Sequence, residues 1–156
     1  MADMLVNLLK LPEVDHYASA YTAQGIRIIR AMAPDQRTVT AWVEKHFGPC
    51  WASECGVCFT HQPITCFLAV KEKEILGFAC YEATCKDFFG PIGVREDMRG
   101  SGIGAGLLLH ALHGMRDLGY AYGIIGGVGP ISFYEKTVNA ALIPDSTPGI
   151  YADLLG

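Results

Sequence analysis

Arg99-Gly-Ser-Gly-Ile-Gly-Ala105 is the stretch that decides the fold, because it stands directly before the longest helical pattern in the chain. Its three glycines let the backbone approach a ligand without interference from side chains. Their N–H groups, with the unpaired N–H groups of the helix start, form an anion site that the helix dipole and the Arg99 guanidinium both favour. The stretch therefore predicts a loop that binds a phosphate or a pyrophosphate.

The helix predicted after this loop covers residues 102–118 and carries one apolar stripe. Gly119 follows it in the place of a C-cap glycine. His110 and His113 fall outside the stripe, so we expect them at the surface and without a catalytic role. The stripe consists of Ile103, Leu107, Leu108, Ala111, Leu112, Met115 and Leu118.

The other elements are predicted from hydrophobic periodicity and turn residues. Residues 4–11 fit either a strand or a short helix. The tail, residues 139–155, is interpreted as two strands around a turn at 144–149. Further strands are predicted at 26–32, 65–70, 75–82, 88–94 and 120–125, and further helices at 34–47, 50–58 and 131–138. This order predicts an α/β or α+β fold with a central mixed sheet and helices on both faces.

The composition indicates one domain, residues 1–156, with residues 1–22 as a candidate N-terminal extension. Apolar residues make up 51% of the chain and charged residues 18%, which excludes a disordered protein. The net charge of −4, without a cluster of Lys or Arg, argues against nucleic acid as a partner. No apolar run reaches the roughly 18 residues of a membrane span. The N-terminus also lacks the pattern of a signal peptide, so we expect a cytoplasmic protein without a membrane partner.

Six cysteines, at positions 50, 55, 58, 66, 80 and 85, are then expected as free thiols in a reducing compartment. Cys55-Gly-Val-Cys58, with Cys50 and His61 nearby, has the spacing of half a zinc site. A second pair of ligands at such spacing is missing, so we expect no metal. A short helix is expected instead, with Trp51, Cys55 and Cys58 facing the core.

Three kinds of phosphate-binding loop have glycines in a similar arrangement. A P-loop ends in Gly-Lys-Ser/Thr, whereas Ala105 and Gly106 follow Gly104 here. A dinucleotide-binding loop needs an acidic residue at the end of the next strand, and the strand at 120–125 ends in glycines. The third form, Arg/Gln-x-x-Gly-x-Gly/Ala, is satisfied by Arg99, Gly102 and Gly104.

This third form resembles the acetyl-CoA signature of the GNAT N-acetyltransferases. Ile92-Gly-Val94 ends a strand just upstream, as the fourth strand of that family does. Phe133-Tyr-Glu-Lys136 resembles the family's motif on its fourth helix, and the hairpin at 65–82 resembles its second and third strands. The resemblance covers residues 25–145.

The resemblance implies a mostly antiparallel mixed sheet whose fourth and fifth strands splay apart to admit the pantetheine arm. Pro91 and Gly93 suit a strand that loses its pairing on one side. By similarity, the chain uses acetyl-CoA as cosubstrate and needs no metal. The implied cofactor-binding residues are Ile92 and Val94, through their backbone, and Arg99, Gly100, Ser101, Gly102, Ile103, Gly104 and Ala105 around the pyrophosphate.

The implied reaction is direct attack of a primary amine on the thioester. Tyr134, carried over from the helix motif, is the implied general acid for the departing thiolate, and an N–H near Val94 is the implied oxyanion donor. The general base is left open, because Phe88 stands where several members of the family carry Glu. Asp87 and Glu82 are the nearest carboxylates, and Glu82 is interpreted as a solvated charge at the end of a strand.

The sequence leaves the acceptor open among a small amine, an amino acid, an amino sugar and a protein N-terminus. Four aromatic residues are candidates for its pocket, namely Trp51, Tyr81, Phe88 and Phe89. We also expect a homodimer, on general grounds. The alternative function is a catalytically weak acetyl-CoA-binding sensor or regulatory module. The missing fourth-strand carboxylate favours this alternative, whereas Tyr134 favours the enzyme.

Overall fold

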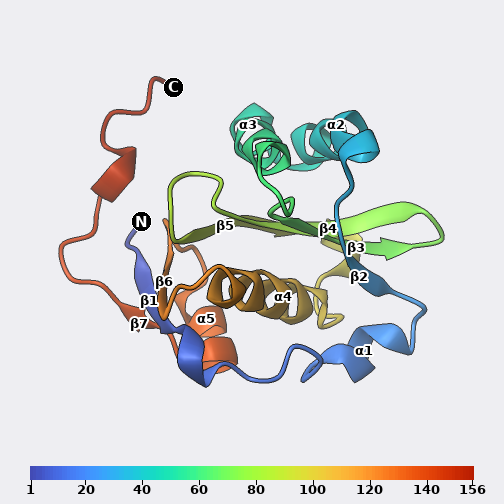
Figure 1. Cartoon of the computed structure of the whole chain (residues 1–156), viewed down its shortest axis with the longest axis horizontal. Helices are drawn as coiled ribbons and strands as arrows, with labels where there is room; N and C mark the ends of the chain where they lie inside the picture. The colour runs from blue at the N-terminus through green and yellow to red at the C-terminus, as the bar shows by residue number, and fades with distance from the viewer.

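The computed structural model describes residues 1–156 as a seven-stranded sheet between two layers of helices (Figure 1). The strands lie in the order β2-β3-β4-β5-β6-β1-β7 across the sheet. They are β1 (Met4–Asn7), β2 (Arg27–Arg30), β3 (Cys66–Lys71), β4 (Glu74–Tyr81), β5 (Phe88–Val94), β6 (Tyr122–Ile125) and β7 (Ala141–Leu142). The helices are α1 (Ala18–Thr22), α2 (Gln36–Phe47), α3 (Pro49–Val57), α4 (Ile103–Asp117) and α5 (Ile131–Val138), with 3-10 turns at Leu8–Lys10, Ala33–Asp35, Cys58–Thr60, Glu96–Met98 and Gly149–Tyr151. None of these helices has the length and the apolar character that crossing a membrane requires.

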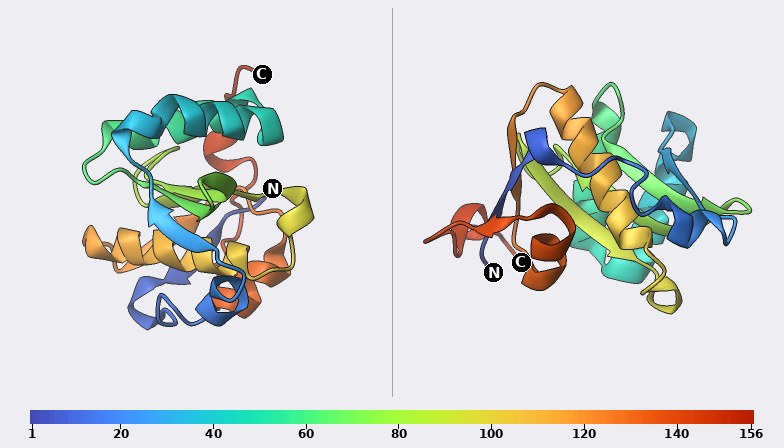
Figure 2. Two further views of the ribbon diagram at one scale, coloured as in Figure 1. Left: turned by 90° about the vertical axis from the view of Figure 1, so that its right-hand side faces the viewer. Right: turned by 90° about the horizontal axis from the view of Figure 1, so that it is seen from below.

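Two apolar cores lie on opposite faces of the sheet, which confirms the predicted fold class. Figure 1 shows α2 and α3 over one face and α1, α4 and α5 over the other, and Figure 2 shows α4 crossing the sheet. Side chains alternate along β3 and so contribute to both cores. Phe67 and Ala69 join the core under α4, whereas Leu68 and Val70 join the core under α2 and α3. The predicted stripe of α4 is buried except for Leu118, which lies past the end of the helix.

Residues 1–22 belong to the body of the fold and do not form a separate extension. β1 lies between β6 and β7 and pairs antiparallel with both. Met4, Val6 and Leu8 are fully buried, so the segment that fitted either a strand or a helix is a strand followed by one 3-10 turn. The Asp3 carboxylate accepts a hydrogen bond from the Gly127 N–H at 2.8 Å, which joins this segment to the loop after β6.

The sheet is antiparallel except where β5 and β6 run side by side in the same direction. Their pairing is confined to Phe88 with Ile124 and Phe89 with Ile125. Residues 90–94 of β5 pair with β4 alone. The side of β5 that faces away from β4 therefore carries backbone groups without a strand partner.

The prediction of two strands in the tail is wrong. β7 covers only Ala141–Leu142, and no second strand follows it. Pro144 and Pro148 have no N–H to donate to a sheet ladder, so the chain turns away from the sheet. The turn brings Tyr151 back over the loop after β6, where its hydroxyl lies 2.9 Å from the position that a β-carbon on Gly126 would take.

Candidate active site

The loop between β5 and α4 presents a row of backbone N–H groups that have no acceptor in the protein. Gly102 is the N-cap of α4, and the N–H groups of residues 100–105 form no hydrogen bond within the chain. Gly100 and Gly102 have φ angles of 83° and 84°, a conformation in which successive N–H groups can converge on one anion. A β-carbon on Gly102 would lie 2.8 Å from the β-carbon of Ala20, so a larger residue does not fit. The loop therefore has the geometry of an anion site, with Arg99 at its start.

The unpaired edge of β5 lies next to this loop. The Arg95 N–H donates to the Leu76 carbonyl at 2.8 Å, so the backbone groups of Arg95 face β4. In an antiparallel ladder this orientation alternates along the strand, and Gly93 faces β4 as well. The backbone groups of Ile92 and Val94 therefore point to the opposite side, where β5 has no strand partner.

A cleft of about 780 Å³ runs along this edge. Its walls are the loop before α4, the second half of β5, the end of β6 and one face of α5. Arg99 carries the only charged side chain in the lining, so the end of the cleft at the loop is cationic and the side chains elsewhere are mainly apolar. The predicted site residues that line it are Ile92, Val94, Arg99, Gly100, Gly102, Gly104, Ala105 and Tyr134.

Tyr134 reaches the cleft from α5 and is 5% exposed. Burial raises the pKa of its hydroxyl to about 12, and no hydrogen bond within the protein engages that hydroxyl. The adjacent Phe133 ring lies 3.7 Å from the position of a β-carbon on Gly104, so α5 packs against the start of α4. A phenol with a raised pKa stays protonated in the neutral range and can donate a proton to an atom in the cleft.

A second cavity, of about 360 Å³, adjoins the cleft where β5 and β6 cease to pair. Glu54 from α3 carries the only charged side chain in its lining, and burial raises the pKa of the Glu54 carboxyl. Tyr151 from the tail and Trp51 from α3 add aromatic rings to the walls. The two cavities share Met1, Trp51, Gly90, Pro91, Gly126 and Gly127.

A model of the acetyltransferase (GNAT) family matches residues 28–138 of the chain. The chain belongs to the GNAT acetyltransferase family. The matched residues run from β2 to the end of α5 and include the anion loop, the free edge of β5 and Tyr134. No curated protein matches the GNAT chain significantly by sequence.

Solved structures share the fold of this GNAT domain. A fungal multi-domain GH3 beta-N-acetylglucosaminidase with a GCN5-related glucosamine N-acetyltransferase region superposes with a TM-score of 0.74 at 16% identity, over 91% of this chain and 19% of that one. A GCN5-related N-acetyltransferase from Sphaerobacter thermophilus superposes with a TM-score of 0.66 at 20% identity, over 91% of this chain and 48% of that one. This chain thus spans less than half the length of either protein, and at these identities the likeness shows the fold alone.

Two of the residues predicted to bind the coenzyme do not line the cleft of the GNAT domain. Ile103 is fully buried in the core under α4. The Ser101 hydroxyl donates to the Met98 carbonyl at 2.5 Å. The N–H groups of both residues belong to the row without acceptors, so any contact with a ligand runs through their backbone. Coenzyme binding by these residues stays a prediction.

The four aromatic candidates for an acceptor pocket fall into two groups. Trp51 was expected to face the core, but it is 36% exposed, stacks on Phe47 at 5.3 Å between ring centroids and lines both cavities. Phe89 lines the larger cleft. Phe88 and Tyr81 line neither cavity, and Tyr81 is fully buried.

Glu54 and Tyr151 are site residues that the sequence analysis missed. Glu54 stands one residue before Cys55 in a short helix with little amphipathic pattern, and Tyr151 stands in a tail that was expected to form a strand. Both reach the second cavity through contacts between segments far apart in the chain. No local pattern of residues could have indicated those contacts.

The two carboxylates nearest to Phe88 in the sequence, Glu82 and Asp87, lie outside both cavities. Glu82 accepts hydrogen bonds from the Asp87 N–H at 2.6 Å and from the Tyr120 hydroxyl at 3.2 Å, so its interpretation as a solvated charge is wrong. Burial and the neighbouring Glu82 raise the pKa of Asp87 to about 6. The Asp87 Oδ1 is buried without a hydrogen-bond partner. Neither carboxylate is placed to act on a ligand in the cleft.

Replacing Asp87 with Asn is expected to stabilise the GNAT domain at pH 7 by about 1 kcal/mol. The pKa of Asp87 is raised on folding from its ordinary 3.8 to about 6, so ionisation costs the folded state stability as the pH rises across that range. Below that range the carboxyl is neutral in both states and the cost disappears. Asn also tolerates the φ of 64° at this position. Thermal unfolding of both proteins at pH 7 and at about pH 4 measures the gain, and an equal gain at both pH values would contradict the explanation.

His110 and His113 are half-buried, which corrects the expectation of a free surface position. The His110 Nδ1 lies 2.8 Å from the Gly106 carbonyl, and the His113 Nε2 lies 2.8 Å from the Pro12 carbonyl. Neither ring lines either of the two cavities described above. The His113 ring therefore ties α4 to the segment before α1, whereas the His110 ring bonds within α4 and lies 5.3 Å from the Phe67 ring of β3.

Proposed function

We propose that this GNAT domain transfers an acetyl group from acetyl-CoA to a primary amine of a small molecule. The observation that carries the proposal is one continuous cleft that joins the N–H row at residues 100–105 to the Tyr134 hydroxyl. A diphosphate suits the N–H row and the Arg99 guanidinium at the cationic end. The apolar remainder suits an extended arm that carries a thioester.

The free edge of β5 supports this placement of the arm. The backbone groups of Ile92 and Val94 point into the cleft without a strand partner. An extended ligand with amide groups can satisfy them as an added strand does. The thioester then lies near Pro91, where the cleft meets the second cavity.

The proposed step is direct attack of a neutral amine nitrogen on the thioester carbonyl carbon. The carbonyl oxygen gains negative charge as the C–N bond forms, and the unpaired N–H of β5 next to Pro91, that of Ile92, donates to it. When the C–S bond breaks, the departing thiolate takes the proton of the Tyr134 hydroxyl. The proton that leaves the attacking nitrogen restores Tyr134 through solvent.

Glu54 is the proposed general base. A free alkylamine has a pKa of about 10 and is almost wholly protonated at pH 7. The Glu54 carboxylate attracts this ammonium, and the rings of Trp51 and Tyr151 can contact its charge. Burial raises the pKa of Glu54 and lowers that of an ammonium in the same cavity, so both shifts favour proton transfer to Glu54.

The volume of the second cavity favours a small acceptor. At about 360 Å³ it stands at the low end of ligand pockets. Amino sugars belong among the candidates, because one solved relative with this fold contains a glucosamine N-acetyltransferase region.

Replacing Glu54 with Gln is expected to lower kcat/KM about 100-fold at pH 7. The loss should shrink as the pH approaches about 10, because the amine is then neutral without a base. Steady-state rates from pH 6 to pH 10 measure both effects. Glu44→Gln, on the exposed face of α2, is the matched control and should match the wild type. A loss of equal size at every pH would exclude the role of base.

Calorimetry with acetyl-CoA, followed by a thiol-release assay on a panel of amines that includes amino sugars and amino acids, tests the proposed function. We expect saturable binding of acetyl-CoA and amine-dependent release of CoA. Binding without turnover on the whole panel would favour the alternative of a sensor module. Absence of saturable binding would exclude both.

A further inference from the structure

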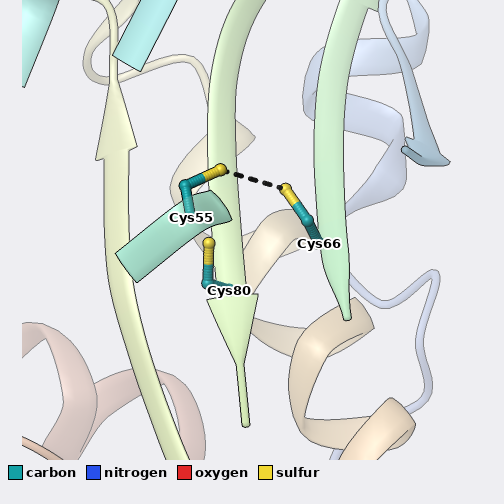
Figure 3. Close-up of side chains that lie close together, drawn as sticks. All are labelled: Cys55, Cys66 and Cys80. Atoms are coloured by element: carbon teal, nitrogen blue, oxygen red, sulfur yellow. Dashed lines mark hydrogen bonds between the residues drawn. The ribbon is translucent and has the colours of Figure 1, made fainter. Parts of the chain in front are cut away.

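Three buried thiols meet between α3 and the sheet, outside both cavities (Figure 3). Cys55 comes from α3, Cys66 from β3 and Cys80 from β4. Their Sγ atoms all lie within 4.8 Å of one another, and those of Cys55 and Cys66 are 4.0 Å apart. Figure 3 shows the thiols of Cys55 and Cys66 pointing toward each other, with Cys80 beside them.

The pairing of two strands supplies the ligands that the sequence analysis found missing. Cys66 and Cys80 stand directly opposite each other in the β3–β4 ladder and point to the face covered by α3. Short ligand spacing along the chain does not indicate this pair, because 13 residues separate Cys66 from Cys80 in the sequence. The sheet brings them together, and α3 lays Cys55 over both.

A fourth thiol lies at the edge of this cluster. Cys58 follows Cys55 by one helical turn, and its Sγ lies 3.9 Å from the carbonyl oxygen of Tyr81, the residue after Cys80. Burial, followed by the neighbouring thiols of Cys55, Cys58 and Cys66, raises the pKa of Cys80. Cys58 is thus a neighbour of Cys80 at the edge of the cluster.

We propose that Cys55, Cys66 and Cys80 bind one zinc ion, with Cys58 as the fourth ligand. In a tetrahedral site with Zn–S bonds of about 2.3 Å, the sulfur atoms are about 3.8 Å apart. The separation of 4.0 Å between Cys55 and Cys66 is close to that value. The Sγ atom of Cys80 lies within 4.8 Å of the other two. Four sulfur ligands select zinc over magnesium or calcium, which prefer oxygen.

Binding replaces protons by the metal ion. Each thiol that coordinates zinc releases its proton to solvent as its sulfur–zinc bond forms, so affinity rises with pH. All four cysteines are fully buried, so we expect the metal to enter during folding and to exchange slowly afterwards.

The site would fix α3 to the sheet. This helix also carries Trp51 and Glu54, which line the second cavity. Zinc would therefore have a structural role and would hold that wall of the cavity in place. The inference does not rest on the proposed acetyl transfer, because the cluster lies outside the cleft.

Packing without metal is the competing explanation, since buried free cysteines commonly behave as small apolar side chains. The two explanations differ in one substitution. Val is about one methyl group larger than Cys and has no metal-binding atom. Under simple packing, the wild type, Cys66→Val and Cys80→Val should all have unfolding temperatures that zinc and chelators leave unchanged.

The test is the metal content of protein produced in zinc-supplemented medium and dialysed against a chelator. We expect about one zinc ion per wild-type chain, and loss of nearly all of it in Cys66→Val and Cys80→Val. Refolding from denaturant with and without zinc should show a higher unfolding temperature in the zinc sample. Refolding with Co²⁺ should give sulfur-to-cobalt charge-transfer absorption and the visible bands of a tetrahedral site.

Cys50→Ser and Cys85→Ser are the matched controls, because Cys50 is exposed and Cys85 is partly buried away from the cluster. Both should retain the zinc of the wild type. Zinc that persists in Cys66→Val would place the metal elsewhere and overturn the proposal. Wild-type protein without stoichiometric zinc and without the cobalt bands would overturn it as well, whether or not the valine variants fold.

Discussion

Tyr134→Phe is expected to lower the kcat of acetyl transfer about 1,000-fold and to leave the affinity for acetyl-CoA nearly unchanged. The phenol is buried at the cleft, no group of the protein accepts its proton, and burial raises its pKa to about 12. Removing the hydroxyl removes the proton that the departing thiolate needs, while the ring that packs beside Phe89 is kept. Single-turnover rates with a saturating amine, alongside calorimetry with acetyl-CoA, measure the two quantities.

Tyr122→Phe is the matched control for this prediction. Tyr122 is 52% exposed on β6 and lines neither cavity, so its variant should turn over like the wild type. The pKa of about 12 also predicts that Tyr134 causes no fall in the wild-type rate up to pH 10. Full turnover by Tyr134→Phe would remove the role of general acid.

Gly102→Val is expected to raise the Kd for acetyl-CoA by about 100-fold or more. The reason is that a β-branched residue is strained at positive φ, so the loop leaves the conformation that binds the diphosphate. The φ of Gly102 is 84°, and any β-carbon there would lie 2.8 Å from that of Ala20. The loop must move to relieve the backbone strain and the contact with Ala20. The N–H groups of residues 100–105 then no longer converge on a diphosphate. Isothermal titration with acetyl-CoA measures the change in Kd.

Gly119→Val separates loss of binding from loss of stability. Gly119 has a φ of 107° with no atom within 4 Å of an added β-carbon, and it lies at the opposite end of α4. This control should lower the unfolding temperature and leave the Kd unchanged. A Kd for Gly102→Val that equals that of the wild type would show that the loop does not hold the diphosphate.

Local patterns predicted the elements around the cleft well. The stripe from Ile103 to Met115, with glycines at both ends, indicated α4 to within about one residue at each end. The apolar runs and the charged turn of the β3–β4 hairpin and the apolar run of β2 were similarly informative. These signals are strong because residues within one helical turn or one hairpin satisfy each other's hydrogen bonds.

Local sequence patterns failed to predict the structure where contacts between distant segments determine it. The tail could not be predicted, because its two residues of strand pair with β1, at the other end of the chain. Glu82 was expected in solvent, but its carboxylate accepts a hydrogen bond from the hydroxyl of Tyr120, 38 residues further along the chain. When the hydrogen-bond partner of a side chain lies far along the chain, the residues next to that side chain do not indicate the partner.

The sequence by itself determined that Arg99 to Ala105 begins a helix with free N–H groups, because glycine conformation and helix geometry are local properties. Only the tertiary structure decided that β1 enters the sheet beside β6, that Glu54 and Tyr151 border the second cavity, and that Cys66 and Cys80 meet Cys55. Each of these depends on which apolar surfaces pack together, and the hydrophobic effect that drives such packing has no direction along the chain.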